Sequence, residues 1–163
     1  METSLIRHTI QGLDEPTTQK VLDLLEPRLA ALVDLQLTLK HIHWNVTGPN
    51  FIAVHEMLDP QTEAVRAATD ALAERIATLG GTPVGTPGNV VETRTWDEYD
   101  LGTADAMDHL QKLDAVYDGV IGDHRAAREA VADLDPVTED LLIGQLTMLE
   151  AAQWFVRGHL GQR

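Results

Sequence analysis

The chain has 163 residues and a mass of 17.9 kDa, which suits one domain large enough to bury a core. It contains no cysteine, which excludes disulfides, zinc–thiolate sites, iron–sulfur clusters and cysteine nucleophiles. The formal net charge of −14 comes without any Lys/Arg cluster, so nucleic-acid phosphates are poor partners, and the charge serves either solubility or the attraction of cations. Without a membrane-spanning apolar run or a recognisable signal peptide, we expect a cytoplasmic protein with no membrane partner.

The first predicted helix follows a short N-terminal tail, residues 1–13. Asp14 suits the N-cap position, and Pro16 suits the first helical turn. Apolar residues then recur at helical spacing until Gly48 ends the pattern. Pro27 lies inside this stretch and predicts either a kink or the true start of the helix.

A second helix is predicted over residues 51–79, with Asn50 as its candidate N-cap and a kink at Pro60. Residues 80–102 are rich in Gly, Pro and Thr and form a long connection. Within it, residues 95–99 are expected to form a short helix.

The third predicted helix covers residues 103–132, and Asp135-Pro136 marks the start of a fourth that ends near Gly158. A connection of more than twenty residues inside a compact domain needs a structural reason. One such reason is a ferritin-like four-helix bundle, which has one long crossover. We therefore predict an all-α fold of this type over residues 14–163, with a short helix in the crossover between the second and third helices.

Two pairs of potential metal ligands lie on the second helix. His55 and Asp59 are four residues apart and share one helix face, and so do Asp70 and Glu74. Imidazole and carboxylate ligands suit iron, manganese or zinc. Either pair alone is also what an acidic surface helix carries by chance.

The distance between the two pairs limits how they could bind a metal ion. Asp59 and Asp70 are eleven residues apart, so they face nearly the same way but lie roughly 16 Å apart along the helix axis. One ion therefore cannot bind both pairs from one chain, whereas two antiparallel copies about a two-fold axis could hold two sites. No Glu-x-x-His motif occurs, so a di-iron site inside one bundle is not expected.

Three segments together resemble the Dps family, the DNA-binding proteins from starved cells, or mini-ferritins. They are residues 43–51 (His-Trp-Asn-Val-Thr-Gly-Pro-Asn-Phe), 54–59 (Val-His-Glu-Met-Leu-Asp) and 70–75 (Asp-Ala-Leu-Ala-Glu-Arg). The resemblance covers nearly the whole chain, including Trp96 in the crossover and the segment Gln153-Trp154-Phe155.

The resemblance implies a hollow homododecamer with ferroxidase sites at its two-fold interfaces. One subunit would supply His43, His55 and Asp59, and its partner would supply Asp70 and Glu74. Fe(II) would be oxidised there, by hydrogen peroxide in preference to dioxygen, and stored inside as ferric mineral. The cell would thereby be protected from oxidative damage.

Three further residues gain roles from the resemblance. Trp44 would be a sacrificial electron donor beside the iron, although core packing explains it equally well. Asp135 and Asp140 would line the three-fold pore through which iron enters, while Asp135 also suits a helix N-cap.

Alternative functions remain open at this stage. A DNA-compacting structural protein with little ferroxidase activity, located at the nucleoid, is the runner-up. The charge and the lack of basic tails make direct DNA binding doubtful. A catalytically idle cage and a zinc-type hydrolase at the same residues are further alternatives. His109, His124 and His159 are expected on helix surfaces, without an assigned function.

Overall fold

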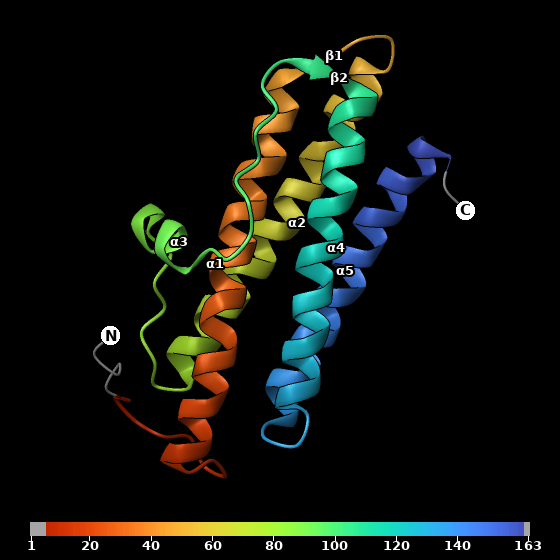
Figure 1. Ribbon diagram of the computed structural model, residues 1–163. Coiled ribbons are helices and arrows are strands. Elements are labelled where there is room, and N and C mark those ends of the chain that lie inside the picture. Colours follow the sequence, from red (N-terminus) through yellow and green to blue (C-terminus); the bar gives the residue numbers. More distant parts are fainter. Residues whose placement is uncertain (1–5, 162–163) are drawn as a thin grey trace.

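The computed structural model describes residues 6–161. Its elements, in chain order, are α1 (Glu15–Asn45), β1 (Val46–Thr47), α2 (Phe51–Thr78), α3 (Pro87–Thr93), β2 (Ala104–Asp105), α4 (Ala106–Val131) and α5 (Pro136–Leu160). α1 packs antiparallel against α2, and α4 against α5, so the long helices form the predicted four-helix bundle (Figure 1). Within the described residues, no helix combines the length and apolar character needed to cross a membrane.

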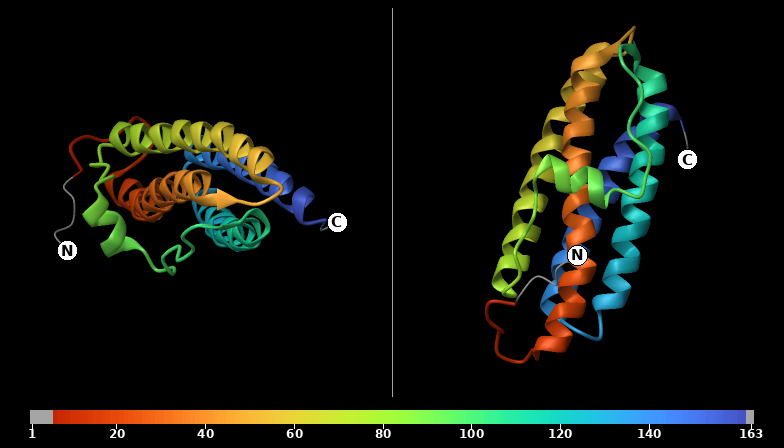
Figure 2. Two further views of the ribbon diagram at one scale, coloured as in Figure 1. Left: turned by 90° about the horizontal axis from the view of Figure 1, so that it is seen from above. Right: turned by 60° about the vertical axis from the view of Figure 1, so that its left-hand side comes forward.

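The crossover, residues 79–105, returns along the length of the bundle, so α2 and α4 point the same way (Figures 1 and 2). Its short helix is α3, Pro87–Thr93, and the prediction of a helix at residues 95–99 was wrong. Pro87 lies in the first helical turn, where the missing backbone N–H of proline costs no helical hydrogen bond. Trp96 is instead tied to α1, because its indole Nε1 donates to Asp34 Oδ2 over 2.7 Å.

Two of the three predicted N-caps are confirmed. Asp14 accepts a hydrogen bond from the backbone N–H of Thr17 at the start of α1. Asp135 accepts one from the N–H of Val137 at the start of α5. Asn50 precedes α2, but its side chain makes no capping hydrogen bond.

Two prolines lie inside long helices. Pro27 lies within α1 and Pro60 within α2, so Pro27 does not mark the start of the first helix. Each proline removes one backbone donor, and the surrounding packing keeps the helix continuous across it.

The core is formed by the apolar faces of the four long helices, and it also contains buried imidazoles. His109 and His124 are fully buried on α4, so the prediction that they lie on the surface was wrong. Both continue the apolar stripe that includes Leu113 and Tyr117, and this spacing places them inside. His159 is exposed, as expected.

Residues 7 and 8, which precede α1, pack against the end of α2. The backbone N–H of Arg7 donates to Gly80 O over 2.9 Å, and the ring Nε2 of His8 lies 3.1 Å from Thr78 O. Gly80 has a φ of +88°, and a Cβ there would collide with the backbone of His8. These contacts satisfy carbonyl groups that the helix end leaves without donors.

Candidate metal centre

The short connection between α1 and α2 brings His43 and His55 together. α1 ends two residues after His43, and β1 then pairs in parallel with β2, with Val46 opposite Ala104. The chain reverses at Gly48, whose φ of +96° favours glycine. His55 therefore lies on the second turn of α2, beside the last turn of α1.

The two imidazole rings stack, and each forms a hydrogen bond with the backbone carbonyl of the other histidine. Their centroids are 3.6 Å apart, and the planes differ by 21°. His43 Nδ1 lies 2.8 Å from His55 O, and His55 Nδ1 lies 2.8 Å from His43 O. A carbonyl oxygen only accepts, so each Nδ1 carries the hydrogen and donates. Donation from Nδ1 leaves Nε2 as the nitrogen through which each ring would bind a metal ion.

Asp59 lies next to this histidine pair and carries a salt bridge. Its Oδ1 is 3.4 Å from His43 Nδ1 and accepts a hydrogen bond from Lys40 Nζ over 2.9 Å. The hydrogen bond from Lys40 lowers the pKa of the Asp59 carboxyl. The sequence analysis missed Lys40, although its position one helical turn before His43 was a usable signal.

Asp70 and Glu74 lie on the same helix as Asp59 but farther along it. Both side chains are exposed, and neither forms a hydrogen bond or ion pair with another part of the chain described here. In residues 6–161, no three His, Asp or Glu side chains come close enough together to hold a metal ion. His55 and Asp59 each lie next to His43, but the three do not by themselves form such a group, and Asp70 and Glu74 lie farther along α2.

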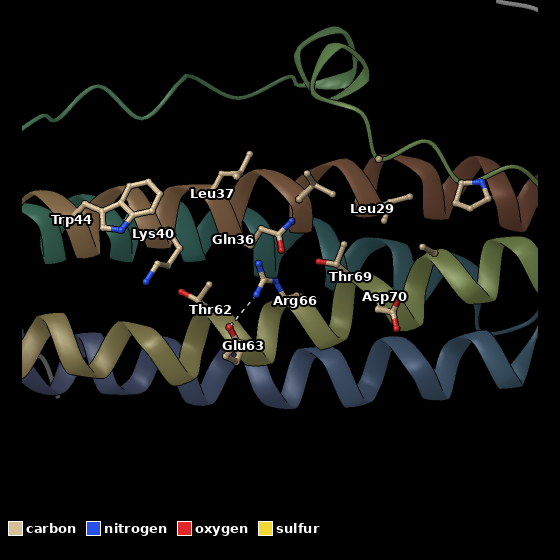
Figure 3. Close-up of a pocket in the computed structure, with 14 residues that line it drawn as sticks. Leu29, Gln36, Leu37, Lys40, Trp44, Thr62, Glu63, Arg66, Thr69 and Asp70 are labelled. Carbon is tan, nitrogen blue, oxygen red and sulfur yellow. Dashed lines mark hydrogen bonds and ion pairs between the residues drawn. The ribbon is translucent and has the colours of Figure 1, made fainter.

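An open groove of about 660 Å³ runs between α1 and α2 beside these residues (Figure 3). Lys40 and Trp44 line it from α1, and Arg66 and Asp70 line it from α2. The Trp44 side chain is 72% exposed, so it does not pack in the core of this chain. Lys40 Nζ lies 5.9 Å from the centroid of the Trp44 ring, within the range of a cation–π interaction. The role of Trp44 as an electron donor stays a prediction.

The two predicted pore residues differ sharply in their surroundings. Asp135 is buried, forms a 2.5 Å ion pair with Arg75 and accepts a hydrogen bond from the Thr138 hydroxyl. Burial by itself would raise the pKa of the Asp135 carboxyl, but these hydrogen bonds outweigh that effect and lower it. Asp140, in the second turn of α5, is exposed. Of the two, only Asp140 presents an exposed carboxylate.

Comparison with known proteins now defines the class of this chain. Residues 22–163 match the family model of the ferritin-like domain. The fold prediction, an all-α ferritin-like four-helix bundle, is thereby confirmed.

Comparison with individual proteins identifies the family within the ferritin-like class. The chain is 55% identical over 152 residues to the DNA protection during starvation protein of Mycolicibacterium smegmatis, covering 93% of this chain and 83% of that protein. The structure of DpsA14 from Streptomyces coelicolor matches with a TM-score of 0.94 and 55% identity, over 96% of this chain and 94% of that one. The fine tangled pili major subunit of Haemophilus ducreyi is 52% identical over 153 residues, which cover 94% of this chain and 81% of that protein. The chain belongs to the Dps family of ferritin-like proteins.

Proposed function

We propose that this protein is an iron-sequestering ferroxidase whose sites form between two subunits. His43, His55 and Asp59 of one subunit would bind Fe(II) together with Asp70 and Glu74 of the other. The observation that carries this proposal is the reciprocal pair of imidazole–carbonyl hydrogen bonds on two stacked rings, which leaves Nε2 of each ring as the nitrogen that can bind a metal ion. The mixed imidazole and carboxylate set suits iron and stabilises its ferric state.

The surface around these residues supports association with a second copy. Leu37 and Trp44 both line the groove between α1 and α2, and each is more than half exposed in the single chain. Large apolar side chains that gather on one exposed face commonly mark a protein interface. Because Asp59 and Asp70 are roughly 16 Å apart on one helix face, two antiparallel α2 helices would bring each pair opposite the other.

The proposed reaction consumes both reagents of hydroxyl-radical chemistry. Two Fe(II) ions each give one electron to one hydrogen peroxide, which takes up two protons and leaves as two waters. The ferric product would be stored as mineral inside a dodecameric cage, with Asp140 on its entry path. Such a reaction would account for DNA protection, the role for which the Mycolicibacterium smegmatis relative is named, without direct DNA contact by a chain of net charge −14. This role fits a cytoplasmic location, within reach of the nucleoid.

The experiment is anaerobic loading with Fe(II), followed by a stoichiometric pulse of hydrogen peroxide and measurement of ferric absorbance. We expect fast oxidation in the wild type and slow oxidation in the double variant Asp70→Ala/Glu74→Ala. The double variant Asp97→Ala/Glu98→Ala removes the same charges from the exposed crossover and is the matched control. Equal slow rates in all three proteins would overturn the proposal and favour a structural cage.

A further inference from the structure

Tyr99 in the crossover forms a hydrogen bond with a buried imidazole of α4. Its hydroxyl oxygen lies 2.7 Å from His109 Nδ1. Burial lowers the pKa of His109, so the ring is neutral near pH 7 and can accept a proton. Since a phenol is a stronger acid than a neutral imidazole N–H, Tyr99 donates in this pair.

The pair is connected to the candidate metal centre through α1. The ring of His41 packs edge-on against Tyr99 with centroids 5.9 Å apart, and His41 Nε2 lies 2.7 Å from Leu101 O. His41 precedes His43 by two residues on the same helix. One aromatic contact, from Tyr99 to His41, and the α1 backbone between residues 41 and 43 thus connect Tyr99 to the histidine pair.

A phenol can give up an electron easily only if its proton leaves at the same time, because the oxidised phenol is a very strong acid. His109 Nδ1 is a base placed at hydrogen-bond distance for that proton. The chain offers an internal comparison, since it contains two tyrosines. The Tyr117 hydroxyl donates to Gln61 Oε1 over 2.8 Å, and an amide oxygen is a far weaker base than an imidazole.

We propose that Tyr99, with His109 as its proton acceptor, donates the second electron when peroxide meets a centre that holds a single Fe(II). The O–O bond of the peroxide then breaks with one electron from Fe(II) and one from Tyr99. Two protons enter from solvent, and two waters leave. The phenolic proton of Tyr99 moves to His109 Nδ1, leaving a neutral tyrosyl radical and an imidazolium. This inference rests on the proposed ferroxidase function, and it explains how such a centre would avoid releasing hydroxyl radical.

The test is electron paramagnetic resonance on samples frozen rapidly after one equivalent of peroxide is added to protein with less than one Fe(II) per site. We expect a tyrosyl radical in the wild type and in Tyr117→Phe, and its loss in Tyr99→Phe. Protein grown on ring-deuterated tyrosine must show a narrowed signal, which separates tyrosine from tryptophan. His109→Gln keeps a hydrogen-bond acceptor but removes the base, so the radical yield must fall there too.

Ferric absorbance in the same samples distinguishes failure of the Tyr99 proposal from failure of the ferroxidase proposal. Normal ferric formation with an unchanged radical in Tyr99→Phe would overturn the role of Tyr99 and leave the ferroxidase proposal intact. Absence of ferric formation in the wild type would overturn both. A spin trap adds a further readout, since Tyr99→Phe is expected to release more trappable hydroxyl radical than Tyr117→Phe.

Discussion

The ammonium group of Lys40 lies 2.9 Å from Asp59 Oδ1, where it neutralises one of the proposed metal ligands. A divalent cation that binds Asp59 must compete with this internal cation. The Lys40–Asp59 pair is solvent-exposed enough for the lysine to swing away at little cost. We therefore expect Lys40 to lower the affinity of the proposed centre for a metal ion without preventing binding.

Replacing Lys40 tests this relationship. Lys40→Met keeps the aliphatic part of the side chain and removes the competing charge, so the affinity for a divalent probe ion such as Co(II) is expected to rise several-fold. Titration calorimetry under anaerobic conditions measures the change. Lys112→Met, which breaks the pair with Asp100 on the crossover, is the matched control. Unchanged affinity in Lys40→Met would show that the salt bridge does not oppose metal binding.

His124 predicts a loss of stability in acid. It is fully buried, and burial together with Arg28 lowers its pKa to about 4, whereas the unfolded chain has the ordinary value near 6.5. The unfolded state therefore binds more protons between these values, so stability is complete above about pH 6.5 and falls as the pH drops toward 4. The loss can reach roughly 3 kcal/mol per subunit.

Urea unfolding at pH 7 and pH 4.5, at one fixed protein concentration, checks this expectation. His124→Gln can still hydrogen-bond with Gln145 and cannot become charged, so its stability should change less between the two pH values. His159→Gln alters an exposed imidazole and should behave as the wild type. The same pH dependence in all three proteins would assign the acid sensitivity to other groups.

Asp135 is expected to matter for stability. Asp135→Ala removes the N-cap of α5 and leaves the largely buried guanidinium of Arg75 without its carboxylate partner. A cost of about 3 kcal/mol follows from these two losses together. Thermal unfolding measures it, with Arg75→Ala/Asp135→Ala as the companion that removes both charges. A larger loss in the double variant than in Asp135→Ala would contradict the account.

Asp140 is expected to affect iron uptake and not stability, because its carboxylate is exposed and lies past the first turn of α5. Asp140→Asn should slow the appearance of ferric mineral while the size of the assembly stays the same. Size-exclusion chromatography and ferric absorbance give both readouts. Uptake at the wild-type rate would remove Asp140 from the entry path.

The sequence predicted the four long helices well, because their apolar periodicity and the caps at Asp14 and Asp135 are local signals. The crossover was harder to predict. Its helix at residues 87–93 begins with a proline in the first turn, while residues 95–99 form no helix and Trp96 is tied to Asp34 of α1 by a tertiary hydrogen bond. Local propensity does not register a contact between segments sixty residues apart.

The candidate metal centre, too, was only partly predictable from the sequence. The spacing of His55, Asp59, Asp70 and Glu74 on one helix face was visible in the sequence. The ring stacking of His43 on His55 and the salt bridge from Lys40 depend on how α1 meets α2, so only the three-dimensional structure reveals them. His109 and His124 follow the apolar stripe of α4, so the stripe was a better guide to their burial than their polarity.

The most direct test of the inter-subunit centre is complementation between two inactive variants. His55→Ala/Asp59→Ala lacks one half of the proposed site, and Asp70→Ala/Glu74→Ala lacks the other half. Each alone should oxidise Fe(II) slowly. In mixed assemblies produced by co-expression, two-fold pairing at random restores about a quarter of the sites, so a comparable share of the wild-type rate should return. Mixed assemblies as slow as either parent would contradict a site shared between two subunits.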